Sequence, residues 1–145
     1  MFNVPLLAQR LMQALDWACR RDDLNTLPIG LFGASTGAAA ALVTAAECPQ
    51  KVAAVVSRGG RPDLASIELE RVRAPTLLIV GASDTEVLVL NRDAYRLLQC
   101  EKRLEVVPRA THLFEEAGTL ESAAQAAREW FGLHFAAKTA TDPGG

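Results

Sequence analysis

The chain has 145 residues, half of them hydrophobic, and 15 lysines and arginines against 17 aspartates and glutamates, which gives a formal net charge of −2 at pH 7. A chain of this length can bury a substantial core as one domain. The near-neutral charge excludes the basic field that attracts nucleic acid or an anionic membrane surface. No stretch approaches the ~18 apolar residues of a membrane span, and no secretion signal is recognisable. We therefore expect a cytoplasmic location and neither nucleic-acid nor membrane binding.

Short apolar runs alternate with helical patterns along the chain, which is typical of an α/β fold with a parallel sheet between helices. The predicted helices lie at about 4–21, 36–47, 64–69, 87–98 and 120–135. The predicted strands lie at about 28–32, 52–57, 76–80 and 103–107. On the last helix, a single apolar stripe is expected to contain Leu120, Ala123, Ala127, Trp130, Phe131 and His134. Residues 136–145 form a small polar tail that we expect to be disordered, so the folded domain spans 1–135.

The three cysteines, Cys19, Cys48 and Cys100, are odd in number and widely spaced. They lack the CxxC or Cys/His spacing that is typical of a metal site or a disulfide framework. We interpret them as buried thiols of a reducing compartment, and we expect neither a metal nor another cofactor.

A GxSxG pattern, Gly33 to Gly37, lies between the first predicted strand and the following helix. Small residues there permit the strained turn that exposes a nucleophilic serine at the carboxyl end of a strand. Ser35 is therefore the candidate nucleophile, and the backbone N–H of Thr36 is a candidate donor to an oxyanion. The pattern also fits a glycine-rich turn in which Ser35 only caps the helix, so the serine alone leaves both interpretations open.

The order of the polar residues that follow favours catalysis. In α/β hydrolases the triad comes as Ser, then Asp or Glu, then His, each in a loop after a successive strand. Asp84 follows the apolar strand TLLIV, and His112 follows LEVV. Asp84 also fits a helix cap, and Glu86 is a weaker candidate for the acid. The second histidine, His134, is expected to be a packing or surface residue of the last helix.

The sequence resembles the dienelactone hydrolase family, in particular a bacterial subgroup of serine-type members sometimes fused to a phosphoribosyltransferase domain. The matching stretches are LPIGLFGASTGAAAAL, VVSRGGRPDLA, APTLLIVGASD with VLVLNR, and ATHLFEE. The resemblance implies hydrolysis of a small ester, thioester or lactone, with Ser35 as nucleophile, Asp84 as acid and His112 as base. Two residues depart from the family: better-known members use cysteine as nucleophile, and Arg109 stands where the subgroup carries glycine.

The family fold resembles an eight-stranded sheet, whereas this chain opens at the helix before the nucleophile strand. The resemblance thus implies the C-terminal portion of an α/β hydrolase, without the loop that supplies the second oxyanion N–H. A misassigned gene start, a fragment or a second polypeptide would each account for this. Without the early strands, strand 28–32 is expected to be an unpaired apolar edge through which the chain self-associates as a homo-oligomer.

Two arginines, Arg58 and Arg61, follow the second predicted strand in SRGGRPD. On the sheet edge of the triad they would grip a substrate carboxylate, or they would form salt bridges in a solvated loop. Glu115 and Glu116 are interpreted as solvated residues near the start of the last helix, where negative charge is favoured.

Two other functions remain open from the sequence. The first is a nucleotide-binding module, in which glycines after a strand and Arg58 after the next would meet a dinucleotide phosphate. This interpretation leaves Asp84 and His112 without a task. The second is a truncated, non-catalytic hydrolase that serves as an interaction subunit.

Overall fold

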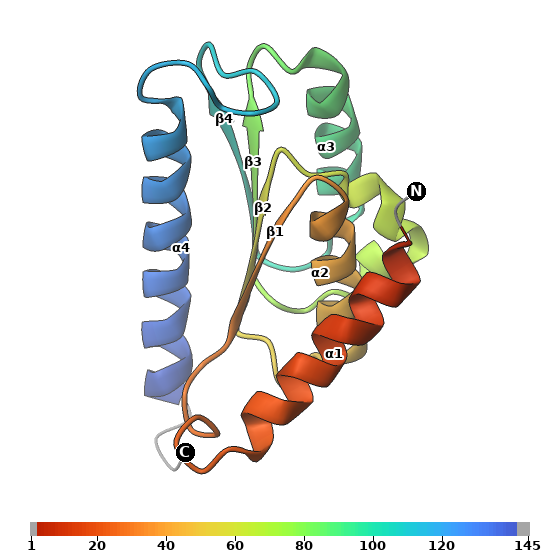
Figure 1. Cartoon of the computed structure of the whole chain (residues 1–145), viewed down its shortest axis with the longest axis vertical. Helices are drawn as coiled ribbons and strands as arrows, with labels where there is room; N and C mark the ends of the chain where they lie inside the picture. The colour runs from red at the N-terminus through yellow and green to blue at the C-terminus, as the bar shows by residue number, and fades with distance from the viewer. Residues whose placement is uncertain (1–2, 142–145) are drawn as a thin grey trace.

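The computed structural model describes residues 3–141. The elements in chain order are α1 (Val4–Arg20), β1 (Gly30–Ala34), α2 (Thr36–Glu47), β2 (Ala54–Arg58), the 3-10 helix η1 (Pro62–Arg71), β3 (Thr76–Gly81), α3 (Thr85–Leu97), β4 (Lys102–Val107) and α4 (Thr119–Thr141). The strands form one parallel sheet in the order β1-β2-β3-β4. Helix α4 covers one face of this sheet, and α1, α2 and α3 lie on the other side (Figure 1). The predicted α/β class is confirmed.

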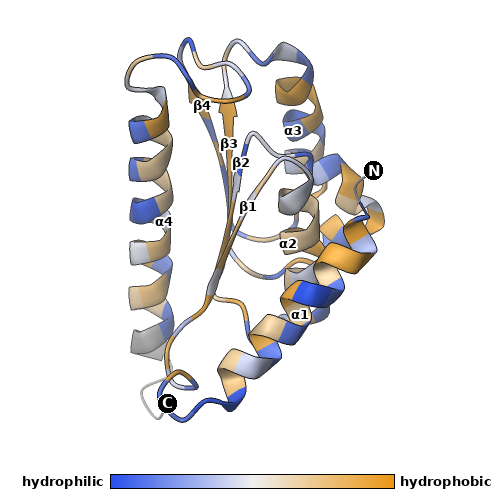
Figure 2. Cartoon of the chain, in the orientation of Figure 1, coloured by the Kyte–Doolittle hydropathy of each residue, from blue (hydrophilic) through white to orange (hydrophobic). Residues whose placement is uncertain are grey.

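The core consists of two apolar layers, one on each face of the sheet. Val55 and Leu78 contribute to the layer beneath α2, and Val56 and Ile79 contribute to the layer beneath α4. Neighbouring strand residues serve opposite layers because successive side chains point to opposite faces of a sheet. Every residue of β3 is buried, as its continuous apolar run predicts for a strand that is covered on both faces. Figure 2 shows β3 in the colour of hydrophobic residues along most of its length.

Helix α2 is packed closely between the sheet and α1. Its residues Ala38, Ala39, Ala40 and Ala41 are almost fully buried, and their small side chains permit a short distance between helix and sheet. The hydroxyl of Thr44, also buried, donates to the Ala40 carbonyl of its own helix and to the Ala8 carbonyl of α1. The helix that carries the candidate nucleophile at its start is therefore held rigidly from both sides.

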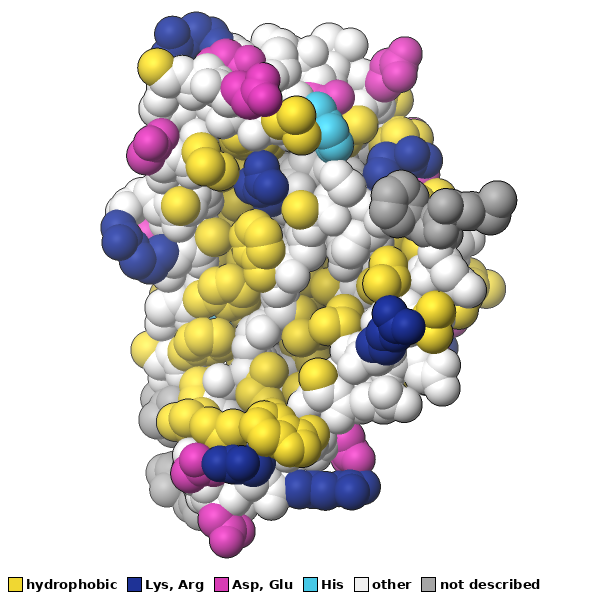
Figure 3. All heavy atoms as spheres, viewed as in Figure 1, with side chains coloured by type: hydrophobic (Ala, Val, Ile, Leu, Met, Phe, Trp, Pro, Cys, Tyr) yellow, Lys and Arg dark blue, Asp and Glu magenta, His cyan; other side chains and the backbone are white. Residues whose placement is uncertain are grey.

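The two edges of the sheet differ in charge. Strand β4 carries Lys102, Arg103 and Glu105, and such charges protect an edge from pairing with another chain. Strand β1 has no charged residue, and Phe32 in its middle is 52% exposed. Within residues 3–141, no strand pairs with the free side of β1. Figure 3 shows a continuous apolar surface on this face, between α4 and α1.

An apolar groove of about 420 Å³ lies beside the β1 edge. Its lining comprises side chains from the end of α1, the segment before β1, β1 itself and α4, including Leu24, Leu27, Ile29, Phe32, Phe131 and Phe135. The unpaired apolar edge that the sequence predicts is thus present in the described part of the chain.

Several predicted boundaries need correction. The first strand begins at Gly30 rather than at Pro28, because proline lacks the N–H that a ladder needs. Helix α4 continues to Thr141 instead of ending near Phe135, because the alanines and Lys138 that follow are good helix formers. Residues 136–141 are therefore helical rather than disordered, and 142–145 of the predicted tail lie outside the described residues.

The predicted burial of Leu120 and of the cysteines also needs correction. Leu120 is 50% exposed and does not belong to the buried stripe of α4. The three cysteines are free and only half-buried, packed against the edge of the larger core layer rather than inside it. None of the helices in the described part of the chain is long and apolar enough to cross a membrane.

Candidate active site

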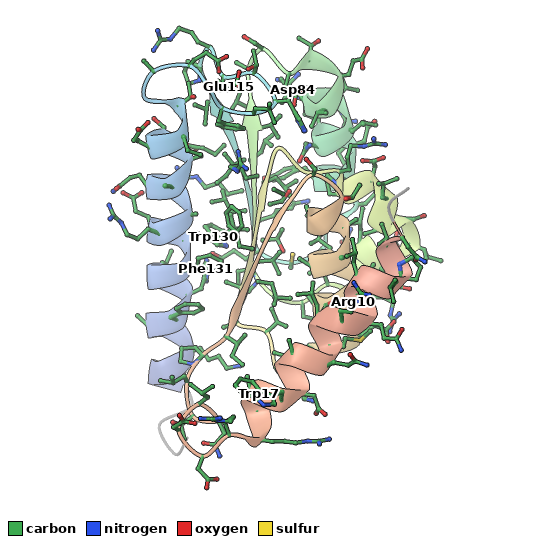
Figure 4. All side chains as sticks on the ribbon, in the orientation of Figure 1. Arg10, Trp17, Asp84, Glu115, Trp130 and Phe131 are labelled. Carbon is green, nitrogen blue, oxygen red and sulfur yellow. The ribbon has the colours of Figure 1, made fainter. Side chains whose placement is uncertain are left out.

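The three candidate triad residues follow three strands of the sheet, at the edge where those strands end. Ser35 follows β1, Asp84 follows β3 and His112 lies in the loop after β4. Because parallel strands end on the same side of a sheet, their loops form one crevice. The structure brings the three side chains together: Ser35 Oγ lies 3.1 Å from His112 Nε2, and His112 Nδ1 lies 2.9 Å from Asp84 Oδ2. Figure 4 shows Asp84 at this end of the sheet, beside the loop that follows β4.

Ser35 adopts a strained backbone conformation, with φ 51° and ψ −125°, in a region that side-chain-bearing residues rarely occupy. It is the residue before the first turn of α2, but among the described residues its side chain makes no capping hydrogen bond. The hydroxyl instead faces His112. Of the two interpretations that the sequence leaves open, the helix cap is therefore wrong for this side chain.

Gly33 makes the tight turn after β1 possible. A Cβ atom at Gly33 would lie 2.5 Å from the Gly37 carbonyl oxygen and 2.6 Å from the Ala38 nitrogen, and both are backbone atoms that cannot give way easily. At Gly37 a Cβ would meet nothing within 4 Å among the described atoms. The first glycine of the GxSxG pattern is thus a steric requirement of this chain, and the second is not.

Asp84 occupies the position before α3, yet within residues 3–141 its side chain makes no cap bond to that helix. Its carboxylate, 14% exposed, accepts from His112 instead. Glu86 lies two positions after Asp84, inside the first turn of α3. With Asp84 accepting from the Nδ1–H of His112, the lone pair of Nε2 faces the Ser35 hydroxyl and can take its proton.

The loop that carries His112 is fastened by Glu116, a residue that the sequence predicts to be only solvated. Glu116 accepts from the Thr111 backbone N–H at 2.9 Å and from the Thr111 hydroxyl at 2.7 Å. These hydrogen bonds hold the pKa of the Glu116 carboxyl below its usual range, and the charge of Arg109 adds to this effect. No sequence pattern indicates this contact, because it joins two residues of an irregular loop.

Arg109 and Phe114 lie in the same loop with positive φ angles of 67° and 56°. The left-handed region favours glycine, which gives a physical reason for a glycine at the Arg109 position in the resembling subgroup. Gly81 at the end of β3 completes the support, since a Cβ there would clash with the Ala110 carbonyl oxygen. The loops that carry Asp84 and His112 are therefore in direct backbone contact.

The two candidate substrate-binding arginines have different surroundings. Arg61 forms a double hydrogen bond with Asp63, with both N–O distances at 2.9 Å, and this partner raises the pKa of its guanidinium. The salt-bridge alternative thus holds for Arg61. Arg58 ends β2, and its Cζ lies 5.3 Å from the centre of the Phe114 ring. No carboxylate pairs with Arg58 in the described part of the chain.

Thr36 is the first residue of α2. An N–H group at the first position of a helix has no acceptor within that helix, and the positive end of the helix dipole lies there. This backbone N–H therefore remains available to an oxyanion that forms next to Ser35.

The remaining titratable candidates lie away from this site. His134 packs edge-on against Trp130 on α4, with ring centres 4.4 Å apart, and its Nε2 lies 3.2 Å from Glu101 Oε2. Its predicted packing role is confirmed. Burial raises the pKa of the Cys100 thiol, which makes it a poor nucleophile at neutral pH. Among residues 3–141, no group of three or more His, Cys, Asp or Glu is placed to hold a metal ion.

The strand–serine–helix turn at one end of a parallel sheet, with acid and histidine on the later loops, is the arrangement of an α/β hydrolase. Solved structures share this fold. Among them is a monoacylglycerol lipase from Paleococcus ferrophilus, 19% identical, with a TM-score of 0.69 over 88% of this chain and 76% of that one. The chain belongs to the dienelactone hydrolase family, whose sequence profile matches residues 4–135.

More similar relatives agree with this family. A dienelactone hydrolase from Anabaena variabilis is 56% identical, with a TM-score of 0.91 over 92% of this chain and 62% of that one. Proteins of two Mycobacterium tuberculosis strains, each named a putative phosphoribosyl transferase, are 55% identical over 134 residues, which is 92% of this chain. The chain spans only 30% of those curated relatives. Their name is in keeping with the fusion of this hydrolase type to a phosphoribosyltransferase.

Proposed function

We propose that the chain carries the catalytic triad of a serine hydrolase, with Ser35 as nucleophile, His112 as general base and Asp84 as the acid that orients it. The observation that carries the proposal is the pair of hydrogen bonds through His112, at 3.1 Å to Ser35 Oγ and 2.9 Å to Asp84 Oδ2. Family membership supports a hydrolase rather than a nucleotide-binding module. A nucleotide-binding module would give the two hydrogen bonds through His112 no role.

The proposed reaction begins when Ser35 Oγ attacks the carbonyl carbon of an ester, thioester or lactone. His112 Nε2 takes the hydroxyl proton, and the ionised Asp84 stabilises the resulting imidazolium. The negative charge on the former carbonyl oxygen is stabilised by the Thr36 N–H. The intermediate then expels the alcohol or thiol, which receives the proton from His112 and leaves an acyl group on Ser35. Water, deprotonated by His112, releases the acid in the same manner.

The surroundings of Arg58 support a substrate with a negative charge. The guanidinium is held over Phe114 near the carboxyl end of β2, without a carboxylate partner among residues 3–141. Phe114 follows His112 by two positions, which brings this cation to the histidine loop. A substrate carboxylate would supply the bidentate partner that arginine favours. Arg61 contributes less because Asp63 already occupies its guanidinium.

Thr36 supplies one of the two backbone donors that stabilise an oxyanion in this fold, and we expect weak turnover wherever the second donor is missing. Removing one such donor costs about 10²–10³ in turnover in a well-studied protease. Three free cysteines are in keeping with a reducing compartment, and we place the protein in the cytoplasm.

The test is turnover of p-nitrophenyl acetate by the wild-type chain and by Ser35→Ala. The variant should lose activity to the background rate with an unchanged melting temperature, since alanine suits the start of a helix. Ser66→Ala is the matched control: Ser66 has nearly the same backbone angles, φ 52° and ψ −124°, but is exposed on η1. Equal activity of Ser35→Ala and wild type would refute the proposal. A folded wild-type chain without turnover would favour the non-catalytic interaction subunit.

A further inference from the structure

We infer that Asn91 is a positioning residue for the nucleophile turn, acting through the loop that follows β2. The inference rests on the proposed function, because it assigns a role relative to Ser35 as nucleophile. Asn91 lies on α3 in the VLVLNR stretch, which the triad itself does not use. Its side chain is fully buried.

The loop after β2 touches the nucleophile turn directly. The backbone N–H of Arg61 donates to the Ser35 carbonyl at 2.9 Å. Two positions earlier, the backbone N–H of Gly59 donates to the Ile79 carbonyl of β3 at 2.7 Å. Because Ser35 has a strained backbone conformation, the surrounding structure must hold it in place. The Arg61 N–H is one of the groups that do so.

Asn91 holds Gly60, the residue between Gly59 and Arg61. Its side-chain amide donates to the Gly60 carbonyl at 3.0 Å and to the Val87 carbonyl at 2.8 Å. Both amide protons are therefore used, whereas the buried Oδ1 has no hydrogen-bond partner among the described residues. Through Gly60, Asn91 connects helix α3, which begins directly after Asp84, to the loop beneath Ser35.

Gly60 has no room to move toward α2. A Cβ at this position would clash with Ser57 Oγ and would lie 2.5 Å from Ala38 Cβ, so the loop packs tightly against the first turn of the helix that follows Ser35. A loop held by Asn91 on one side and by α2 on the other keeps the Arg61 N–H beneath the Ser35 carbonyl. Loss of the Asn91 donor leaves the Gly60 carbonyl buried and unpaired, and the loop must shift to satisfy it.

The experiment compares Asn91→Leu, which keeps the approximate volume but removes the amide, with Leu98→Ala as control. Leu98 is a buried core residue at the end of α3, so its truncation destabilises the same helix without removing the Gly60 contact. Asn91→Ser, whose hydroxyl is too short to replace the amide, serves if Asn91→Leu does not fold. All proteins are measured below the onset of unfolding.

Two readouts distinguish positioning from stability. The first is hydrogen exchange of the Arg61 backbone amide, and the second is the rate at which a fluorophosphonate probe labels Ser35. Asn91→Leu should accelerate the exchange and slow labelling by roughly 10- to 100-fold, the effect of a misplacement on the order of 1 Å. Leu98→Ala should leave both close to wild type.

The proposal is overturned if Asn91→Leu keeps the wild-type labelling rate, or if Leu98→Ala slows labelling to the same extent. If the proposed function is wrong, the probe does not label Ser35 even in the wild-type chain. In that case the Arg61 exchange still decides whether Asn91 holds the loop. An unchanged exchange rate in Asn91→Leu refutes the connection itself.

Discussion

Replacement of Asp84 by asparagine removes the charge that stabilises the imidazolium of His112 while keeping the size of the side chain. The introduced amide can also donate to Nδ1, which places the remaining ring proton on Nε2, where it prevents His112 from accepting the Ser35 proton. In the best-studied triad this change lowers turnover by about 10⁴, which corresponds to about 5 kcal/mol of transition-state stabilisation. In the present structure the His112 side chain is 42% exposed and the Asp84 carboxylate only 14%. Water can therefore solvate part of the imidazolium charge, and we expect a loss between about 10² and 10⁴.

The assay is burst-phase and steady-state release of p-nitrophenol, with Glu86→Gln as the matched control. Glu86 is an acid two positions away, inside the first turn of α3, whereas the hydrogen bond to His112 Nδ1 is made by Asp84. Its replacement should leave turnover within a factor of about two, the size of a surface electrostatic effect. If Asp84→Asn retains near-normal turnover while Glu86→Gln loses it, the acid of the triad is Glu86 and not Asp84.

Three further predictions concern the loop, the edge strand and the oxyanion site. The pKa of Glu116 is lowered, so its hydrogen bonds to Thr111 are fully formed above the ordinary glutamate pKa of about 4.3 and are lost as the pH falls through the lower pKa of the folded state. Hydrogen exchange of the Thr111 amide should therefore depend on pH in this range. Glu116→Gln should abolish this dependence. The uncharged β1 edge should make the chain self-associate at micromolar concentration, and Phe32→Lys should shift light scattering toward the monomer; a clean wild-type monomer would contradict this. A longer chain that also contains the remaining part of a dienelactone hydrolase domain should hydrolyse p-nitrophenyl acetate at least about 10² faster, because it supplies the second oxyanion donor. Equal specific activity of the two chains would show that the short chain completes the oxyanion site by itself.

The sequence predicts the order of elements and the three triad positions because both depend on local patterns. The apolar run of β3 and the GxSxG turn need no information from distant residues. The sequence does not predict the exact start of β1, because that start depends on where the pairing with β2 begins, at Gly30 and Ala54. The sequence also does not predict the continuation of α4 beyond Phe135, because small residues and a lysine occur in disordered tails as well as in helices.

Beyond the triad, the long-range contacts within the site could not be predicted. The roles of Glu116 and Asn91 depend on a few hydrogen bonds, and the stretches ATHLFEE and VLVLNR that contain them do not reveal these partners. For Arg61, the sequence left a substrate clamp and a salt bridge open, and only the positions of the side chains show that Asp63 takes both nitrogens. The mutual approach of the Asp84 and His112 loops likewise follows from the register of β3 and β4.

If Ser35 is an activated nucleophile, it should react covalently with an electrophilic probe. The wild-type chain is incubated with a fluorophosphonate probe, digested and mapped by mass spectrometry, in parallel with Ser35→Ala and His112→Ala. Oγ attacks phosphorus, fluoride leaves and His112 takes the proton, so the adduct should appear on the peptide that contains Ser35 and should be absent from both variants. An adduct on another residue, or labelling of Ser35 that persists at the wild-type rate in His112→Ala, would contradict the account.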